Sequence, residues 1–192
     1  MNKEGRDMKY STIIALSIFS SSLYANVGMN AKVGYGASTS GGETEGVFCY
    51  GTEIIYFSNM TLCGSVGYDA WHWSDSEGAF TASITNSSIV LSLGATFFPQ
   101  KKPVASIRGG VGLVTWWKTS ISGSGFLESD NESMIFKDFF GVVDFYVPIC
   151  KNLDIVIQGK FAHQTLSIEE SNQTYSQDWD TFSGKVGLQV IL

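Results

Sequence analysis

The feature that most constrains the fold is a strict alternation of apolar and polar residues that recurs along the chain from residue 27 onward. Alternation with a period of two indicates β-strands that have one apolar and one polar face. Eight such segments follow one another, over residues 27–37, 47–57, 62–73, 88–98, 104–117, 135–149, 153–164 and 182–192. No helical or linker pattern interrupts them, so the sequence predicts one all-β domain.

Short and long connections alternate between these segments. The short ones lie near residues 58–61, 99–103 and 150–152, and long loops are expected over residues 39–46, 74–87, 118–134 and 167–180. This alternation is what an up-and-down sheet needs when all long loops lie at one end. The sequence therefore predicts an eight-stranded antiparallel up-and-down β-barrel.

The first 25 residues have the order of a secretory signal peptide. A basic start precedes an apolar stretch over residues 11–23, and the small residue Ala25 follows. The apolar stretch is too short to span a membrane stably. We therefore expect residues 1–25 to be a signal peptide and residues 26–192 to be the exported barrel.

Alternation alone does not separate a transmembrane barrel from a soluble, lipocalin-like barrel whose apolar face lines a cavity. Only 16% of the residues are charged, whereas a water-facing surface carries about a quarter to a third. The polar faces carry glycine, hydroxyl and amide groups, with a nearly balanced set of charges: Lys32, Glu53, Asp69, Arg108, Asp138, Asp144, Lys160 and Lys185. Because an unpaired buried charge costs several kcal/mol, such balance suits an interior. We expect these eight side chains to form a charge network that fills the lumen.

Aromatic residues gather near the strand ends, where transmembrane barrels place them at the membrane interfaces. The residues concerned are Tyr35, Tyr56 with Phe57, Trp71 with Trp73, Phe97 with Phe98, Trp116 with Trp117, and Phe182. Expected strand lengths of about 9–11 residues also suit tilted membrane strands. With the apolar faces toward lipid, the sequence predicts a transmembrane barrel.

The long connections are strongly acidic, whereas the short turns carry Lys101, Lys102 and Lys151. In transmembrane barrels of bacteria the short turns face the periplasm and the long loops face outside. Two interpretations of the acids stay open: a site for divalent cations or a basic partner, and a merely solvated surface. The acidic residues are Glu43, Glu45, Asp75, Glu77, Glu128, Asp130, Glu132, Glu169, Glu170, Asp178 and Asp180. A pI of about 4.8 argues against nucleic acid as a partner.

Residues that carry catalysis are sparse. His163 is followed by Thr165 and Ser167, a faint likeness to an outer-membrane lipid deacylase, and His72 lies near Asp69 and Asp75. Both histidines fall in the lipid-facing register, and such spacings are common by chance. The sequence predicts no enzyme.

The cysteines do not form a metal or disulfide framework. Cys49, Cys63 and Cys150 are odd in number, lie far apart and match no metal spacing. In a hairpin joined near residues 58–61, Phe57 rather than Cys49 would face Cys63. We expect no metal site and no cofactor.

Three segments resemble the small bacterial outer-membrane β-barrel superfamily, which includes outer-membrane protein A-like and opacity-type surface proteins. They are PVASIRGGVGLVTW (103–116), FFGVVDFYVPICKNLDIVIQGKFAH (139–163) and SGKVGLQVIL (183–192). The last resembles the carboxy-terminal strand that the barrel-assembly machinery recognises, with Leu192 where an aromatic is usual. The resemblance covers residues 26–192. It implies the Gram-negative cell outer membrane as location, and outer-membrane lipid and the assembly machinery as partners.

Several functions stay open from the sequence. The first is a structural or adhesin-like surface protein whose acidic loops contact an extracellular protein. The second is a narrow, porin-like channel lined by the interior charges. The third is a lipid-modifying enzyme of the outer membrane. A soluble, lipocalin-like binder stays open as an alternative fold.

Overall fold

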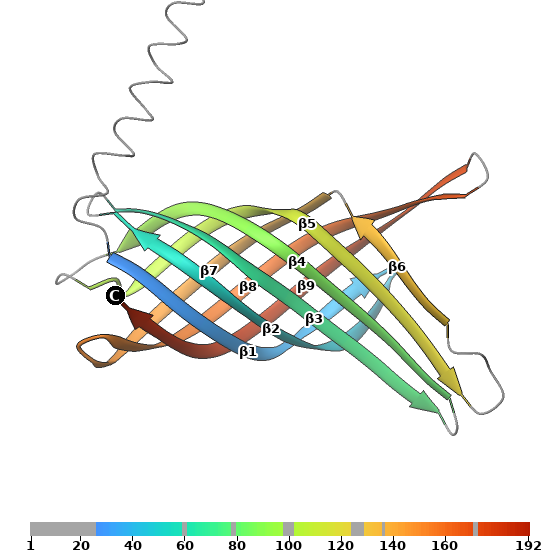
Figure 1. The fold of residues 1–192 in the computed structure, drawn as a ribbon, viewed down its shortest axis with the longest axis horizontal. Helices are drawn as coiled ribbons and strands as arrows, with labels where there is room; N and C mark the ends of the chain where they lie inside the picture. The colour runs from blue at the N-terminus through green and yellow to red at the C-terminus, as the bar shows by residue number, and fades with distance from the viewer. Residues whose placement is uncertain are drawn as a thin grey trace, which may run out of the picture.

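The computed structural model describes residues 26–58, 61–77, 80–97, 102–123, 129–135, 137–170 and 173–192. These residues form the strands β1 (Asn26–Ser40), β2 (Glu43–Phe57), β3 (Leu62–Glu77), β4 (Phe80–Phe97), β5 (Ala105–Gly123), β6 (Ser129–Ile135), β7 (Lys137–Cys150), β8 (Leu153–Glu170) and β9 (Gln173–Ile191). β6 and β7 are successive parts of one barrel strand, so the described residues make eight barrel strands (Figure 1). The predicted signal peptide, residues 1–25, lies outside the described residues.

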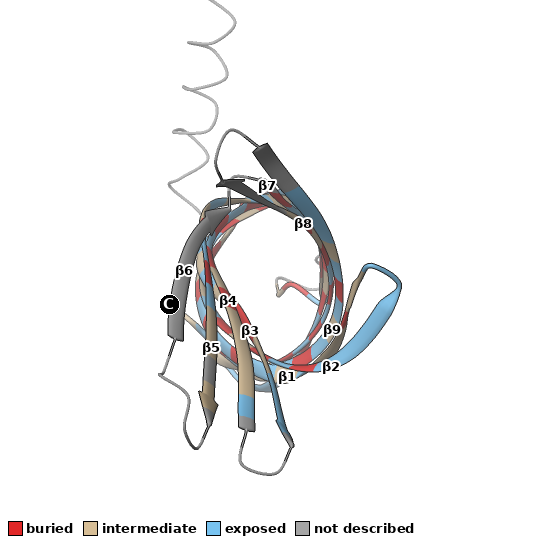
Figure 2. Ribbon diagram, turned by 90° about the vertical axis from the view of Figure 1, so that its right-hand side faces the viewer, coloured by how far each residue is buried: buried red, intermediate tan, exposed pale blue. Residues whose placement is uncertain are grey.

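Each barrel strand is antiparallel to its neighbours in the chain, and the sheet closes on itself. β9 pairs with β1 from Gly28↔Ile191 to Thr39↔Asp180, which joins the last strand to the first. Figure 2 shows the resulting ring. The predicted eight-stranded antiparallel up-and-down barrel is therefore confirmed.

The two faces of the wall differ as the alternation predicts. On the outside, Val33 is 56% exposed and Leu93 is 71% exposed. On the inside, Arg108 is 2% exposed, and Asp144 and Lys185 are buried as well. A lipocalin-like barrel needs the opposite arrangement, so the structure contradicts that alternative. An apolar outer wall around a polar interior is the arrangement that suits a bilayer.

The strands are longer than expected at the end where long loops are predicted. β1 has 15 residues and β9 has 19, and β1 turns directly into β2 through Gly41 and Gly42. The φ angles of these two glycines are +60° and +89°, and two consecutive positive φ angles are what a tight two-residue hairpin turn of this kind requires. Most of each predicted long loop is thus a strand extension. Alternation stops there because both faces meet water, while backbone pairing continues.

A β-bulge in β5 inverts the register of its outer half. The β4–β5 ladder passes from Val90↔Gly112 to Ile89↔Val114, which leaves Leu113 as an extra residue. Beyond it Trp116 is 37% exposed on the outer wall, and Trp117 is 5% exposed inside. The expectation that Trp117 shares the apolar outer face with Leu113 is therefore wrong, because one extra residue moves every later side chain to the other face.

Other aromatics expected at the interfaces also point inward. Phe57 and Trp71 are buried, and Trp73 packs against an interior cluster. They occupy inward positions of β2 and β3. The alternation of outward and inward positions along each strand decides where these side chains point, whereas the clustering of aromatics near the strand ends does not. Tyr35 and Phe182 do lie exposed on the outer wall. Phe98 lies outside the described residues.

The three cysteines form no disulfide bond with one another. Phe57 faces Cys63 across the β2–β3 ladder, as predicted, and Cys49, Cys63 and Cys150 are free thiols. Within the part of the chain that the structure describes, no helix has the length and apolar character needed to cross a membrane.

Candidate functional site

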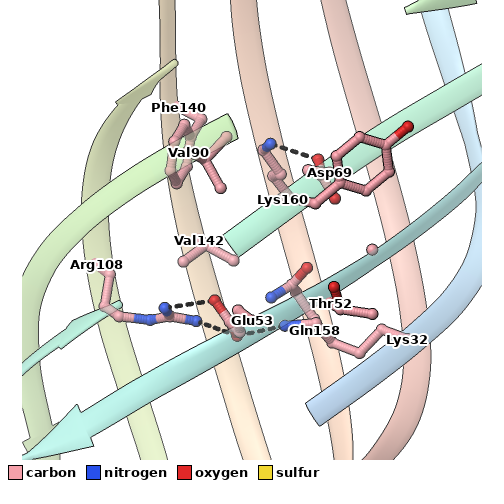
Figure 3. A pocket seen from close by; sticks show the side chains of 12 residues that line it. Lys32, Thr52, Glu53, Asp69, Val90, Arg108, Phe140, Val142, Gln158 and Lys160 are labelled. Atoms are coloured by element: carbon pink, nitrogen blue, oxygen red, sulfur yellow. Dashed lines mark hydrogen bonds and ion pairs between the residues drawn. The ribbon is translucent and has the colours of Figure 1, made fainter. Parts of the chain in front are cut away.

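The candidate site is the polar middle of the lumen, where charged side chains from several strands, Arg108 and Glu53 among them, lie close together (Figure 3). The guanidinium forms a bidentate ion pair with Glu53, with Nη1–Oε2 at 2.8 Å and Nη2–Oε1 at 3.0 Å. Nη2 also lies 2.5 Å from Oδ2 of Asp144, and Lys32 forms an ion pair with Glu53. Nη1 donates to the hydroxyl of Ser65 as well. Two cations meet two carboxylates, so this cluster is neutral.

A second cluster lies further along the lumen around Asp69. Lys160 Nζ is 2.6 Å from Asp69 Oδ2, and Lys185 forms an ion pair with Asp69 Oδ1. Lys160 also lies 4.3 Å from the centroid of the Phe140 ring, a distance at which cation–π attraction operates. Two ammonium groups share one carboxylate, so this cluster carries one net positive charge.

Asp138 lies inside the barrel but, among the described side chains, it forms an ion pair with no lysine or arginine. Its Oδ2 atom accepts hydrogen bonds from Ser88 at 2.9 Å and from Gln164 at 3.1 Å. It faces the same small cavity as Lys160 and Lys185. The structure thus places all eight predicted charges inside and joins seven of them in two clusters, while Asp138 lines the same cavity as Lys160 and Lys185 without an ion pair to either.

A layer of tryptophans lies across the lumen on the side of the hairpin extensions. Trp71 and Trp117 meet edge to face with ring centroids 5.2 Å apart, and Trp179 lies 4.8 Å from Trp117. Val47 and Cys49 are buried in the same cluster. These side chains cover the polar middle from outside.

A second apolar layer lies at the end with the short turns. Phe57 and Tyr146 meet edge to face at 5.7 Å, and Ile55, Cys63 and Val156 are buried with them. Two interior cavities lie next to the charge clusters, with volumes of about 20 and 10 Å³. Each has room for about one water molecule. The described side chains therefore fill the lumen at three levels.

The two histidines do not join a catalytic group with the residues considered for them. His163 Nδ1 lies 2.8 Å from Oδ1 of Asp180, on the outer wall. His72 Nδ1 lies within hydrogen-bond distance of the Thr85 hydroxyl, at 2.8 Å, whereas Asp69 forms ion pairs with lysines inside the lumen. The side chain of Ser167 is not among those described. Among the described residues, no three carboxylate, imidazole or thiol side chains lie close enough together to hold a metal ion.

Ten of the eleven acidic residues predicted in long loops lie in the outer parts of strands. Glu43 and Glu45 begin β2, Asp75 lies near the end of β3, and Asp178 and Asp180 lie in β9, all exposed. Glu77, Asp130, Glu132, Glu169 and Glu170 belong to β3, β6 and β8, but only their backbone is described. Glu128 lies outside the described residues.

Comparisons with known proteins give a structural likeness only. No model of a known protein family matches the sequence, and no curated protein sequence matches it. Ail, the attachment invasion locus protein of Yersinia pestis, superposes with a TM-score of 0.58 at 11% identity, over 86% of this chain and 99% of Ail.

Two further solved barrels are similar. A major outer membrane protein of Thermus thermophilus gives a TM-score of 0.55 at 12% identity, over 85% of this chain and 99% of that one. Neisserial surface protein A gives 0.53 at 16% identity, over 86% and 96%. The chain therefore has the fold of the small β-barrels of bacterial outer membranes.

Sequence reasoning missed the two apolar layers. Alternation marks Val47, Ile55 and Val156 as inward positions, so these residues were recognisable as exceptions on an otherwise polar face. The inward turn of Trp117 had no comparable signal, because a bulge leaves no fixed sequence mark. The partners of each charge were also beyond reach, since they depend on how the strands are staggered around the ring.

Proposed function

We propose that this chain is an outer-membrane surface protein of structural or adhesin type, whose closed barrel anchors strand extensions outside the cell. The observation that carries the proposal is the filled lumen: the Arg108 and Asp69 clusters lie between two apolar layers. A barrel closed in this way serves as an anchor, and its contacts with other molecules fall to the outer wall and the extensions. No observation favours the channel or the enzyme as a second candidate.

The extensions separate from one another above the barrel. Pairing of β2 with β3 ends at Phe48↔His72, and pairing of β7 with β8 ends at Lys137↔Thr165, although β2, β3 and β8 all continue beyond these points. The strands therefore leave the ring as separate groups, as Figure 1 shows for β3–β6 and for β8 with β9. Projecting groups of this kind present a large surface to an extracellular partner.

The charge of this surface favours a basic partner. The described exposed carboxylates at the strand ends belong to Glu43, Glu45, Asp75, Asp178 and Asp180. Ail was solved in complex with the heparin analogue sucrose octasulfate, which is a polyanion. The acidic surface of this chain would repel such a ligand, so the two barrels would differ in the charge of what they bind.

The other proposed partners follow from the wall. Outer-membrane lipid would cover the apolar exterior, and the assembly machinery would bind the carboxy-terminal strand. In that strand Val186, Leu188 and Val190 are exposed on the outer wall and alternate with inward residues.

Reversal of the acidic surface tests the adhesin role. We expect bacteria that display the variant Glu43→Lys, Asp75→Lys, Asp178→Lys to be retained on cultured animal cells about ten-fold less than bacteria displaying the original chain, because complementary charge governs encounter. Lys151→Glu, in an exposed turn at the opposite end, serves as the control and should leave retention unchanged. Added heparin, a polyanion, should also lower the retention of the original strain, because it binds the basic partner and masks it. Equal retention of all three strains, or retention that heparin leaves unchanged, would contradict the basic-partner proposal.

A further inference from the structure

The outer wall has a depression where two small residues lie side by side. Ala31 of β1 is the register partner of Thr52 in β2, and the same row continues to Leu188 in β9 and Tyr68 in β3. All four side chains point outward. Leu188 is 53% exposed and Tyr68 is 38% exposed, so larger side chains rise on both sides of the small pair.

The depression is a groove that follows the strands. It consists of two adjoining hollows of about 620 and 520 Å³, which share Ala31, Thr52 and Leu188. Met29 lies at one end and Val33 at the other, so the groove floor extends about 13 Å at about 3.3 Å per residue. The remaining outward side chains that line it are Ile54, Val66 and Val190 in one hollow, and Tyr50 and Val186 in the other.

The groove lies at the depth of the membrane's hydrocarbon. Along the strands toward the extensions, the outward positions beyond it hold Tyr35, Phe48 and Phe182, which are exposed aromatics of the kind found at a membrane interface. Tyr50, the register partner of Val33, lies at the end of the groove nearest these aromatics, and its ring is 6.3 Å from that of Tyr68, which flanks the middle of the groove. The groove is thus lined mostly by apolar side chains, with the Thr52 hydroxyl in its floor and the tyrosine hydroxyls toward one end.

We propose that this groove binds one acyl chain of an outer-leaflet lipid, with the ester carbonyl of that lipid accepting hydrogen bonds from Tyr50 and Tyr68. An acyl chain is flexible, apolar and narrow, and the ester links it to a headgroup at the interface, where the tyrosines lie. A second copy of the chain fits less well, because a two-fold contact sets the same patch against itself and would place hollow against hollow. This inference rests on the proposed membrane location of the barrel.

Filling the groove tests the proposal. Native mass spectrometry of the folded full chain with dipalmitoyl phosphatidylethanolamine should show one lipid held more tightly than the rest. In the variant Ala31→Phe, Thr52→Leu we expect its affinity to fall at least about ten-fold, because shape complementarity is lost. Ala95→Phe is the matched control: Ala95 also lies on the outer wall, between Leu62 and Ile107, and this variant should bind as the original does.

The tyrosine end of the groove is tested separately. The original chain should prefer the ester lipid to its ether-linked analogue by about five-fold, the size of one net hydrogen bond. In Tyr50→Phe, Tyr68→Phe this preference should disappear while ether-lipid affinity stays the same. Equal lipid binding by all variants would overturn the proposal, and so would a protein dimer that groove filling abolishes, which would assign the groove to a second copy. Failure of the membrane proposal would look different: the chain would then be recovered from cells without detergent.

Discussion

Replacing Arg108 with methionine should lower the free energy of unfolding by about 3–5 kcal/mol, because it leaves buried carboxylates without their cation. Arg108 bridges Glu53 and Asp144, and both the guanidinium and the Asp144 carboxylate are essentially inaccessible to solvent. Lys32 would still pair with Glu53, so the cost falls mainly on Asp144. The measurement is a urea titration of the folded barrel in lipid vesicles.

Two controls separate this effect from general damage. Lys151→Met removes an exposed turn charge and should change the free energy of unfolding by less than about 0.5 kcal/mol. Replacing the whole cluster, with Lys32→Met, Glu53→Gln, Arg108→Met and Asp144→Asn, should recover much of the loss, because a buried ionic group can often be exchanged for neutral residues at little cost. A loss below about 1 kcal/mol for Arg108→Met would mean that the interior is wet enough to solvate Asp144.

Truncating Trp117 to alanine should cost about 3–5 kcal/mol, whereas truncating its neighbour Trp116 should cost about 1 kcal/mol or less. Trp117 is 5% exposed and packs against Trp71 and Trp179, while Trp116 lies on the outer wall. Alanine at position 117 leaves a cavity in the tryptophan layer inside the barrel. Alanine at position 116 only replaces one contact with lipid by another. Urea titration of both variants under the same conditions compares them directly.

The pair also tests the β-bulge at Leu113. Without the bulge Trp117 would point outward with Leu113, and Trp116 would point into the lumen. The costs of the two substitutions would then be reversed. Equal costs would contradict an aromatic layer that closes the lumen.

Alternation defined the architecture because membrane strands are restricted on both faces. Met29, Val33 and Leu93 are exposed on the outer wall, where the proposed membrane location would set them against lipid, and Lys32 and Arg108 are buried inside, so every position within the wall has one acceptable polarity. Beyond the membrane both faces meet water, and the pattern gives no information. For this reason the ends of β1 and β2 at Gly41 and Gly42 appeared in the sequence as a long loop, although backbone pairing continues to the turn.

The interior charges were predictable as a set but not as pairs. Balance and inward register identified Glu53, Asp69 and Arg108 together. Whether Lys160 reaches Asp69 or Asp138 depends on how far β3, β7 and β8 are staggered relative to one another around the ring. The alternation of apolar and polar residues does not determine this stagger. The hydrogen bonds that Asp138 receives from Ser88 and Gln164 are equally non-local.

We infer that side chains close the lumen, so that the barrel anchors a surface and does not conduct. The most direct test is the conductance of a planar bilayer that contains the purified chain, once a mobility shift on boiling has shown that the protein is folded in the lipid. We expect no stable conductance steps from the original chain, because the tryptophan layer, the charge clusters and the Phe57–Tyr146 layer lie across the path. Regular steps whose ion selectivity changes on Arg108→Glu would contradict it and would make the interior charges the lining of a channel.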